Sequence, residues 1–323
     1  MTRRALLSAL ALPLVGGSGN LCAQPHPLVR MIVGVPPGSS TDVVARVVAE
    51  AVAKVLGQTV IVENRPGASG SIATSAFLAA RHDGQTWLMA VNGFFSEAPH
   101  TVRLGFDPLK DVKPLVEIGG GGLVLVGSSA LPPKNLRELV AWARTNMGKV
   151  SYASFSAGSL SHVMGLLLNK AEGLDMLHVP YKGSPPALQD VMGGAVHLMF
   201  DAPPSSLPLI RSGKLRPFAV SSAQRMAVLP DVPTLAELGY KDMTRTAWLG
   251  VWTTPDLPFA EQQRMRTAVL QTMEQPGVRQ RLGELGFVVN AGEPATPEQL
   301  ARQLAIDHTS IGETLRSINY KPE

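Results

Sequence analysis

The chain alternates short runs of apolar and β-branched residues with longer segments in which apolar and polar positions repeat at helical spacing. The short runs predict strands at 59–63, 86–90, 150–154, 175–180 and 196–200. The longer segments predict helices at 43–56, 71–80, 135–145, 159–170, 185–192 and 259–274. Strands that alternate with helices in this way predict an α/β fold, with mostly parallel sheets covered by helices on both faces.

Two stretches interrupt the alternation. Residues 115–127, with the sequence LVEIGGGGLVLVG, place strand-like runs on both sides of four glycines, and residues 245–255 form another apolar run without a helix. The glycines fit either a flexible turn or a hinge. They do not match a dinucleotide-binding fingerprint, because position 124 is valine.

Such extended segments, before and after a central block of strand–helix units, predict a chain that leaves a first lobe, builds a second and returns. About 300 residues is also long for a single core. We therefore predict a first lobe formed by residues 24–122 and 247–323, and a second lobe formed by residues 123–246.

The N-terminus has the pattern of a secretory signal peptide. Arg3 and Arg4 precede an apolar stretch that is too short to span a bilayer, and small residues follow up to a predicted cleavage site after Ala23. The arginine pair fits twin-arginine export as well as the general secretory (Sec) route. Residues 1–23 are therefore expected to be removed from an exported, periplasmic protein.

Removing this segment also removes Cys22, the single cysteine, which excludes a disulfide, a thiolate catalyst and a cysteine metal site. Two of the 29 basic residues are lost with it. The remaining 27 stand against 25 acidic residues, a net charge of +2, and no run of Lys or Arg occurs. This balance argues against nucleic-acid binding.

Common catalytic motifs are absent from the sequence. There is no G-x-S-x-G nucleophile elbow, no G-x-x-x-x-G-K-[ST] phosphate loop and no H-E-x-x-H zinc motif. We interpret the scattered His162, His178 and His197 as structural residues rather than metal ligands. Asp42 and Asp201 are expected near strand ends, one in each lobe, but nothing else supports a glycosidase pair. No metal and no cofactor is therefore predicted.

Polar loops instead follow several predicted strands. In open α/β sheets, ligands bind beyond the carboxyl ends of the strands, where helix N-termini direct backbone N–H groups at them. Four loops are expected there, and they contribute Ser39, Ser40, Thr41 and Asp42; Asn92 and Gly93; Ser154, Ser156, Gly158, Ser159 and Ser161; and Asp201.

The plainer interpretation of Thr41, Asp42 or Ser159, taken singly, is a helix N-cap. One cap needs one hydroxyl, however, whereas the first and third loops each carry several together with a glycine, which lets the backbone approach a small anion. The first loop alone fits a phosphate cradle, a catalytic nucleophile or a carboxylate receptor. The missing phosphate-loop lysine and nucleophile elbow weaken the first two, and the matching third loop favours a clamp for a carboxylate.

The sequence resembles the extracytoplasmic solute receptors of the tripartite tricarboxylate transporter system, the Bug family. The resemblance spans nearly the whole predicted mature chain. It rests on the segments MIVGVPPGSSTDVVAR at 31–46, GQTVIVENRPGASGSI at 57–72, YAS at 152–154 with SH at 161–162, HVPYKGSPPAL at 178–188, LMFDAPPS at 198–205, LPDVPTLAELG at 229–239 and KPE at 321–323.

The resemblance implies a type II periplasmic binding protein fold, in which two lobes joined by crossing strands close on a small carboxylate. Opposed loops would hold the carboxylate, which adds Pro37, Gly38, Ala157 and His162 to the expected binding residues. Tyr181, with Lys182, would support the cleft floor, and Asp201 would lie near the distal end of the ligand. A membrane permease or a sensor kinase is the implied partner, and a monomer is expected.

Several positions depart from the family pattern. Ser39 stands where the family has glycine, so it is either strained or an added donor. Phe155 and Leu160 enlarge the third loop's apolar surface, Ala202 replaces an asparagine, and the loop after Asn92 is more aromatic than usual. These changes predict a cleft with a less polar far end, suited to an aromatic or branched carboxylate.

The sequence leaves two other function classes open. An exported serine-dependent hydrolase would use a cleft serine with His162 or Asp201, since a triad can be assembled from distant residues. A structural or adhesive surface protein would bind no ligand, and the lack of internal repeats argues against it. A solute receptor that is not an enzyme is the preferred hypothesis.

Overall fold

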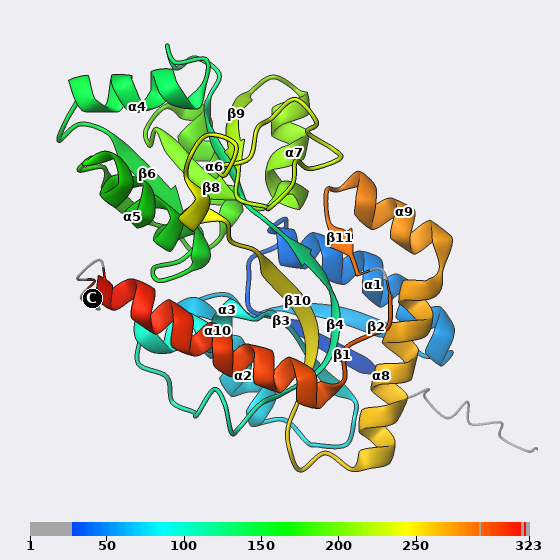
Figure 1. Cartoon of the computed structure of the whole chain (residues 1–323). Helices are drawn as coiled ribbons and strands as arrows, with labels where there is room; N and C mark the ends of the chain where they lie inside the picture. The colour runs from blue at the N-terminus through cyan, green and yellow to red at the C-terminus, as the bar shows by residue number, and fades with distance from the viewer. Residues whose placement is uncertain (1–27, 291, 318–319, 321–323) are drawn as a thin grey trace, which may run out of the picture.

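The computed structural model describes residues 28–290, 292–317 and 320, so the predicted signal peptide at 1–23 lies outside the described residues. Two α/β lobes lie one above the other in Figure 1 and are joined by long crossing strands. This architecture confirms the predicted fold class. Among the described residues, no helix combines the length and apolar character that a membrane span requires.

The first lobe contains a six-stranded sheet in the order β11-β4-β10-β3-β1-β2. Its strands are β1 (Val29–Val33), β2 (Val60–Asn64), β3 (Thr86–Val91), β4 (Lys113–Gly121), β10 (Ala247–Thr253) and β11 (Val288–Val289). Its helices are α1 (Ser40–Leu56), α2 (Ser71–Leu78), α3 (Gly93–Ser96), α8 (Phe259–Glu274), α9 (Pro276–Glu284) and α10 (Pro297–Ser317).

Both faces of this sheet are covered because successive side chains of a strand point to opposite sides. Met31 packs into the core formed with α1, α8 and α9. Its neighbour Ile32 packs into the core formed with α2 and α10. Both residues are at most 1% exposed, which is why residues 31–33 of β1 form a continuous apolar run rather than an alternating one.

The second lobe contains a five-stranded sheet in the order β7-β6-β8-β5-β9. Its strands are β5 (Val124–Ser128), β6 (Ser151–Ser154), β7 (Leu177–Pro180), β8 (Leu198–Asp201) and β9 (Leu215–Val220). Its helices are α4 (Leu136–Thr145), α5 (Leu160–Glu172), α6 (Ser184–Gly193) and α7 (Pro203–Arg211). One core contains α4 and α5, and the other contains α6 and α7.

The sheets are mixed, so the expectation of mostly parallel sheets is wrong. Parallel pairing occurs where strand–helix units repeat, as in β1 with β2 and β3, and β6 with β7 and β8. The long strands β4, β10 and β5 pair antiparallel with their neighbours. These strands carry the chain between the lobes, and no crossover helix sets their direction.

The side chain of Ser221 bridges the two crossings, whose strands β4 and β10 also pair with each other. Its hydroxyl accepts a hydrogen bond from the Leu123 N–H at 2.8 Å and donates one to the Arg245 carbonyl at 2.7 Å. Backbone hydrogen bonds connect Ser221 to the same two residues. The outgoing and returning segments are therefore held side by side.

The glycine run belongs to this crossing rather than to a flexible turn. Gly119, Gly120 and Gly121 end β4, where strands β10 and β11 pair with it. A Cβ at Gly120 would lie 2.1 Å from the Ala247 carbonyl oxygen, and one at Gly119 would lie 2.1 Å from that of Val288. Glycine is required here because the neighbouring backbones approach too closely for any side chain.

Candidate functional site

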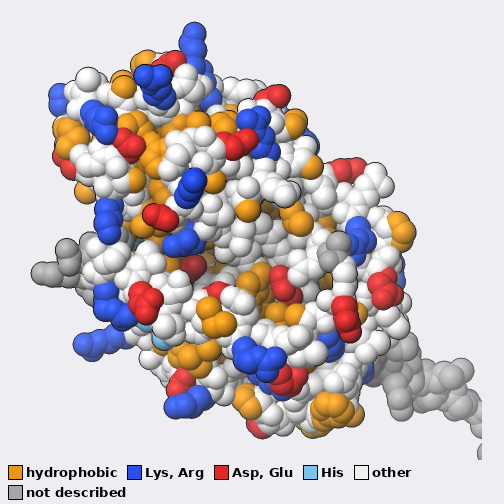
Figure 2. Space-filling view, viewed as in Figure 1, with side chains coloured by type: hydrophobic (Ala, Val, Ile, Leu, Met, Phe, Trp, Pro, Cys, Tyr) orange, Lys and Arg blue, Asp and Glu red, His pale blue; other side chains and the backbone are white. Residues whose placement is uncertain are grey.

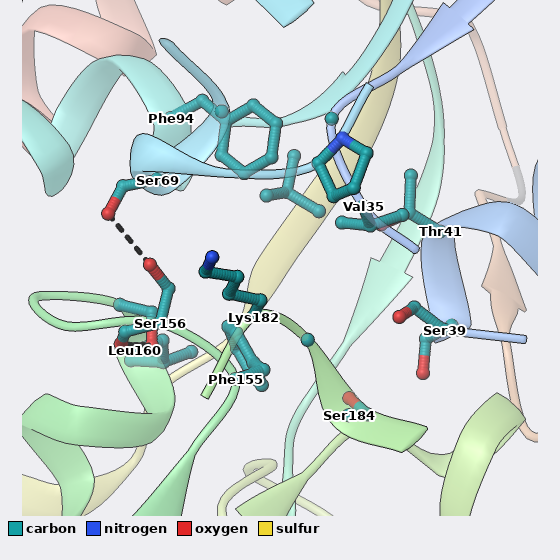
Figure 3. Close-up of a pocket in the computed structure, with 18 of the residues that line it drawn as sticks. Val35, Ser39, Thr41, Ser69, Phe94, Phe155, Ser156, Leu160, Lys182 and Ser184 are labelled. Carbon is teal, nitrogen blue, oxygen red and sulfur yellow. Dashed lines mark hydrogen bonds between the residues drawn. The ribbon is translucent and has the colours of Figure 1, made fainter. Parts of the chain in front are cut away.

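A cavity of about 160 Å³ lies between the lobes, at the ends of strands from both sheets. The view in Figure 2 shows hydrophobic side chains in the hollow between the lobes. The close-up in Figure 3 shows both lobes contributing to the wall. The first lobe contributes Val35, Ser39, Thr41, Ser69 and Phe94, and the second contributes Phe155, Ser156, Leu160, Lys182 and Ser184, among others.

The N-terminus of α1 opens into this cavity with unused hydrogen-bond donors. Ser39 precedes the helix, is 3% exposed, and its hydroxyl has no partner among the described residues. The N–H groups of Ser40 and Thr41 likewise have no acceptor in the described part of the chain. Helix N-termini attract anions, so these donors could bind an anion that enters the cavity.

Ser39 stands where the family has glycine, but its backbone is not strained. Its φ of −69° and ψ of 156° are ordinary extended values. The left-handed conformation falls on Gly38, with φ at +80°. Pro37 and Gly38 shape the turn but are not among the residues that line the cavity, whereas Pro36 is.

Asp42 faces away from the cavity and holds the loop in place. Its carboxylate accepts hydrogen bonds from Arg46 at 2.9 and 3.0 Å, from Asn64 at 2.8 Å and from the Gly38 N–H at 2.9 Å. Burial works against its ionisation, but these donors outweigh burial and hold the pKa of Asp42 below its usual range. The structure therefore places Asp42 as a support for the α1 loop rather than in the wall of the cavity.

Ser40 reaches the other lobe. Its hydroxyl lies 2.8 Å from the Ser205 hydroxyl and donates to the Ala202 carbonyl at 3.2 Å. Ser205 in turn donates to Asp201 at 2.5 Å. The first loop thus combines a row of free donors with a direct contact between the lobes.

The third predicted loop likewise contains some residues that line the cavity and others that do not. Ser156 and Ser159 line the cavity, whereas the remaining members do not: Ser154, Ala157, Gly158, Ser161 and His162. The Ser161 hydroxyl donates to the Phe200 carbonyl at 2.5 Å, and the His162 Nδ1 accepts from the Gly158 N–H at 2.9 Å. These side chains fix the loop from within.

His162 is buried and stacked on His178, with ring centroids 3.5 Å apart. Burial, with an added effect of His178, lowers the pKa of His162 to about 3, so the ring is neutral at physiological pH. Among the described residues there is no group of three His, Cys, Asp or Glu side chains that could hold a metal.

The N-terminus of α5, unlike that of α1, is already occupied by a carboxylate. Glu97 of the first lobe accepts a hydrogen bond from the Leu160 N–H of the second lobe at 3.0 Å. Glu97 lines the cavity and is 8% exposed. Burial raises its pKa to about 7; the Leu160 N–H opposes this shift and Asp307 adds to it.

Residues 66–70, which are not among the predicted site residues, form a wall of the cavity. Ala68 and Ser69 have φ of 45° and 50°, which is unusual for residues with side chains. The Ser69 hydroxyl lies 2.7 Å from that of Ser156 and donates to the Ala157 carbonyl at 3.1 Å (Figure 3). The sequence PGASG does carry a signal, because glycines on both sides of a serine indicate unusual backbone conformations.

The loop after β3 contributes Gly93 and Phe94 to the wall, but not Asn92. The Asn92 side chain accepts from the Trp248 N–H at 3.1 Å and donates to Asp307 at 3.2 Å. Phe94 packs so closely on Gly70 that a Cβ there would lie 2.1 Å from its ring. Asn92 therefore connects β10 and α10, and Phe94 gives the cavity an aromatic surface.

Tyr181 and Lys182 line the cavity, whereas Asp201 does not. Asp201 is fully buried and accepts hydrogen bonds from Ser184 and Ser205, both at 2.5 Å. Burial raises its pKa to about 6, although these hydroxyls act in the opposite direction. Lys182 is exposed, and its side chain extends into the cavity in Figure 3.

The geometry does not support the hydrolase alternative. The Ser154 hydroxyl lies 2.7 Å from the His178 Nε2, which resembles a serine–base pair. Ser154 is fully buried, however, and does not line the cavity, so a substrate has no access to it. Asp201 accepts a hydrogen bond from the cavity serine Ser184, but among the described residues no histidine completes a triad with this pair. In the described structure no hydrogen bond joins His162 to Asp201 or to a serine of the cavity wall.

Comparison with known proteins gives consistent matches. The model of the tripartite tricarboxylate transporter family receptor matches residues 44–314. The periplasmic binding protein BugD has a TM-score of 0.87 at 32% identity, covering 92% of this chain and 99% of its own. A protein of R. palustris, solved with adipate, has a TM-score of 0.87 at 28% identity, covering 92% and 98%. MatC from Rhodopseudomonas palustris, with bound malate, has a TM-score of 0.83 at 30% identity, covering 89% and 98%.

Proposed function

Because the chain belongs to the tripartite tricarboxylate transporter family of receptors, we propose that it captures a small carboxylate in the cavity between its lobes. The family membership confirms the resemblance found in the sequence. It also confirms the class of protein, a periplasmic solute receptor rather than an enzyme.

The observation that carries this proposal is the unpartnered hydroxyl of Ser39. A buried hydroxyl without a partner is costly, and a native protein ordinarily satisfies such a group. Here the hydroxyl and the free N–H groups of Ser40 and Thr41 converge on one wall of the cavity. Together they supply the donors that one carboxylate group requires.

The similar proteins with bound adipate and malate support this ligand class. Away from Ser39, the cavity is bordered by Phe94, Phe155, Val35 and Leu160 (Figure 3). A carboxylate with an apolar body, aromatic or branched, fits such a wall better than one that is polar along its whole length.

Binding would act through closure of the lobes about the crossing strands, with the boundaries at residues 122/123 and 246/247. A ligand that contacts both lobes favours the closed state by its difference in affinity for the two states. Contacts of Ser40 with Ala202 and of Ser69 with Ser156 are the kind of contacts made only on closure.

The receptor would work as a monomer that presents its ligand to a membrane permease or to a sensor kinase. Residues 1–23 would direct its export by the Sec or the twin-arginine route. The description of the family names a transporter, which supports the permease as the first partner to test.

A thermal-shift screen of small carboxylic acids tests the proposal. A ligand at 100 times its Kd adds about 2.7 kcal/mol to the free energy of unfolding, which raises Tm visibly. Ser39→Ala should weaken binding about tenfold to a hundredfold, because a hydrogen bond to a charged group is worth about 1.5–3 kcal/mol. Without ligand the same variant should keep or raise Tm, since its hydroxyl makes no bond within the protein.

Ser161→Ala is the matched control. Its hydroxyl is paired with the Phe200 carbonyl, so this variant should lower Tm and leave the affinity nearly unchanged. A screen in which no carboxylate raises Tm contradicts the proposed function. Binding that is equally strong in Ser39→Ala contradicts the assignment of the carboxylate to the α1 N-terminus.

A further inference from the structure

Glu97 has fewer hydrogen-bond donors than a buried carboxylate requires. Among the described residues, the Leu160 N–H is the one donor to its side chain. An ionised carboxylate has about four acceptor positions, and leaving them empty in a buried site is costly. Because Glu97 also lines the cavity, the donor that it lacks can come from a ligand.

The same residue changes what the α5 N-terminus can bind. In the first lobe, the donors at the α1 N-terminus are free for a ligand carboxylate. In the second lobe, the first N–H of α5 is already bound to the protein's own carboxylate. A second ligand carboxylate placed there would meet Glu97 as a like charge or compete with it for Leu160.

We propose that Glu97 is a specificity-determining residue that selects a carboxylate carrying a hydrogen-bond donor, an amine or a hydroxyl, at its far end. This inference rests on the proposed function, because it assumes that the near carboxylate binds at Ser39. The ligand then has an acceptor at one end, an apolar middle against Phe94 and Phe155, and a donor at the other end.

Lys182 is the other charged side chain of the cavity wall. A free ammonium group favours a second carboxylate, which is the opposite selection. Lys182 is exposed, however, so water competes for it, whereas Glu97 is almost completely buried. The buried group therefore dominates the choice between ligands.

Matched sets of acids test the proposal by isothermal titration calorimetry. One set is hexanoate, 6-aminohexanoate and adipate; a rigid set is benzoate, 4-hydroxybenzoate and terephthalate. In each set the members share one carboxylate and a similar body and differ at the far end. The donor-bearing acid should bind at least tenfold more tightly than the plain acid and the diacid.

Glu97→Gln should abolish this preference and improve diacid binding, because the amide removes the charge and can itself donate. Lys182→Met is the matched control: it changes the net charge of the cavity by one unit and should keep the preference. If the preference disappears in Lys182→Met and persists in Glu97→Gln, then Lys182 recognises the far end of the ligand and the proposal is wrong.

The pH dependence supplies an independent readout. Burial raises the pKa of Glu97 to about 7, with Asp307 adding to the shift, and Lys182 faces the same cavity. An ammonium ligand prefers ionised Glu97, so its affinity should rise between pH 6 and 8. A plain acid offers no such partner, and its affinity should fall over the same range.

Equal affinity for all three members of each set, in the wild type and in Glu97→Gln, overturns the role of Glu97 and leaves the proposed function intact. Tighter binding of the diacid than of the donor-bearing acid by the wild type overturns it in the same way. If neither an acid of these matched sets nor any acid of the wider thermal-shift screen binds, the proposed function itself is wrong.

Discussion

The hydroxyl of Ser69 in the first lobe lies 2.7 Å from the hydroxyl of Ser156 in the second lobe (Figure 3). Ser69 holds this position with a φ of 50°, where a residue with a side chain costs about 1 kcal/mol. Both serines line the cavity, so the contact forms part of the wall that would enclose a ligand. An unfavourable backbone conformation is thus maintained at the junction of the lobes.

Ser69→Ala should weaken ligand binding about threefold to tenfold. The substitution removes a hydrogen bond worth about 0.5–1.5 kcal/mol, which in the proposed closure forms only when the lobes come together. Calorimetric affinity, together with small-angle scattering with and without ligand, measures the effect. Ser75→Ala, an exposed position on α2, is the control and should bind as the wild type does. Unchanged affinity in Ser69→Ala would show that the contact does not contribute to closure.

Gly158→Ala should prevent full closure. A Cβ at this position would lie 2.0 Å from the Thr101 Oγ1 and 2.2 Å from its Cβ, so the two lobes would collide. We expect binding to weaken more than tenfold and the ligand-induced compaction in small-angle scattering to disappear.

Gly148→Ala separates this collision from backbone strain. Gly148 has a φ of 73°, against 72° for Gly158, but the nearest atom to its added Cβ is 3.9 Å away. Both substitutions should cost about 1 kcal/mol of stability through strain. Only Gly158→Ala should weaken ligand binding. An equal loss of affinity in both variants would mean that backbone strain, and not the collision with Thr101, is the cause.

Asp42→Asn should destabilise the protein by about 2 kcal/mol at pH 7, because charged hydrogen bonds from Arg46 are weakened around a buried side chain. The folded state lowers the pKa of Asp42, so its stabilising contribution is complete above the unfolded pKa of about 3.9 and is lost as pH falls through the folded pKa. Urea unfolding at pH 7 and at about pH 3 checks both statements.

Glu50→Gln is the control for this prediction. Glu50 pairs with Lys54 on the same helix, at the same spacing as Asp42 and Arg46, but it is exposed. We expect little change in stability at either pH. A difference between wild type and Asp42→Asn that stays constant as pH falls would mean that the charge of Asp42 does not act as described.

Much of the architecture could be predicted from local patterns. Helix α8 begins and ends at the predicted residues Phe259 and Glu274. Its apolar residues recur at helical spacing over a long segment, and proline-containing segments lie at both of its ends. Helix α10 was not predicted, although it is 21 residues long. Its buried residues Leu300, Leu304, Ile311 and Leu315 recur at helical spacing, so the same kind of pattern that predicts α8 was present here as well.

The site was predicted less completely, for a physical reason. Composition shows which loops are rich in hydroxyls, but not which side chain of a loop faces the ligand. Ser39 and Ser161 have similar sequence surroundings, yet one is an unused donor in the cavity wall and the other is bound to Phe200. Glu97 was not selected at all, because its partner Leu160 lies 63 residues away in the other lobe.

The hydroxyl of Ser221 connects the outgoing crossing at Leu123 with the returning crossing at Arg245. Two separate connections could twist independently, and the lobes could then slide as well as rotate. Because Ser221 bridges them and β4 pairs with β10 along its length, the two crossings have to bend together about a common axis. The proposed closure would then follow essentially one degree of freedom, and the wall that contains Ser39 would meet the same face of the second lobe each time the cavity closed.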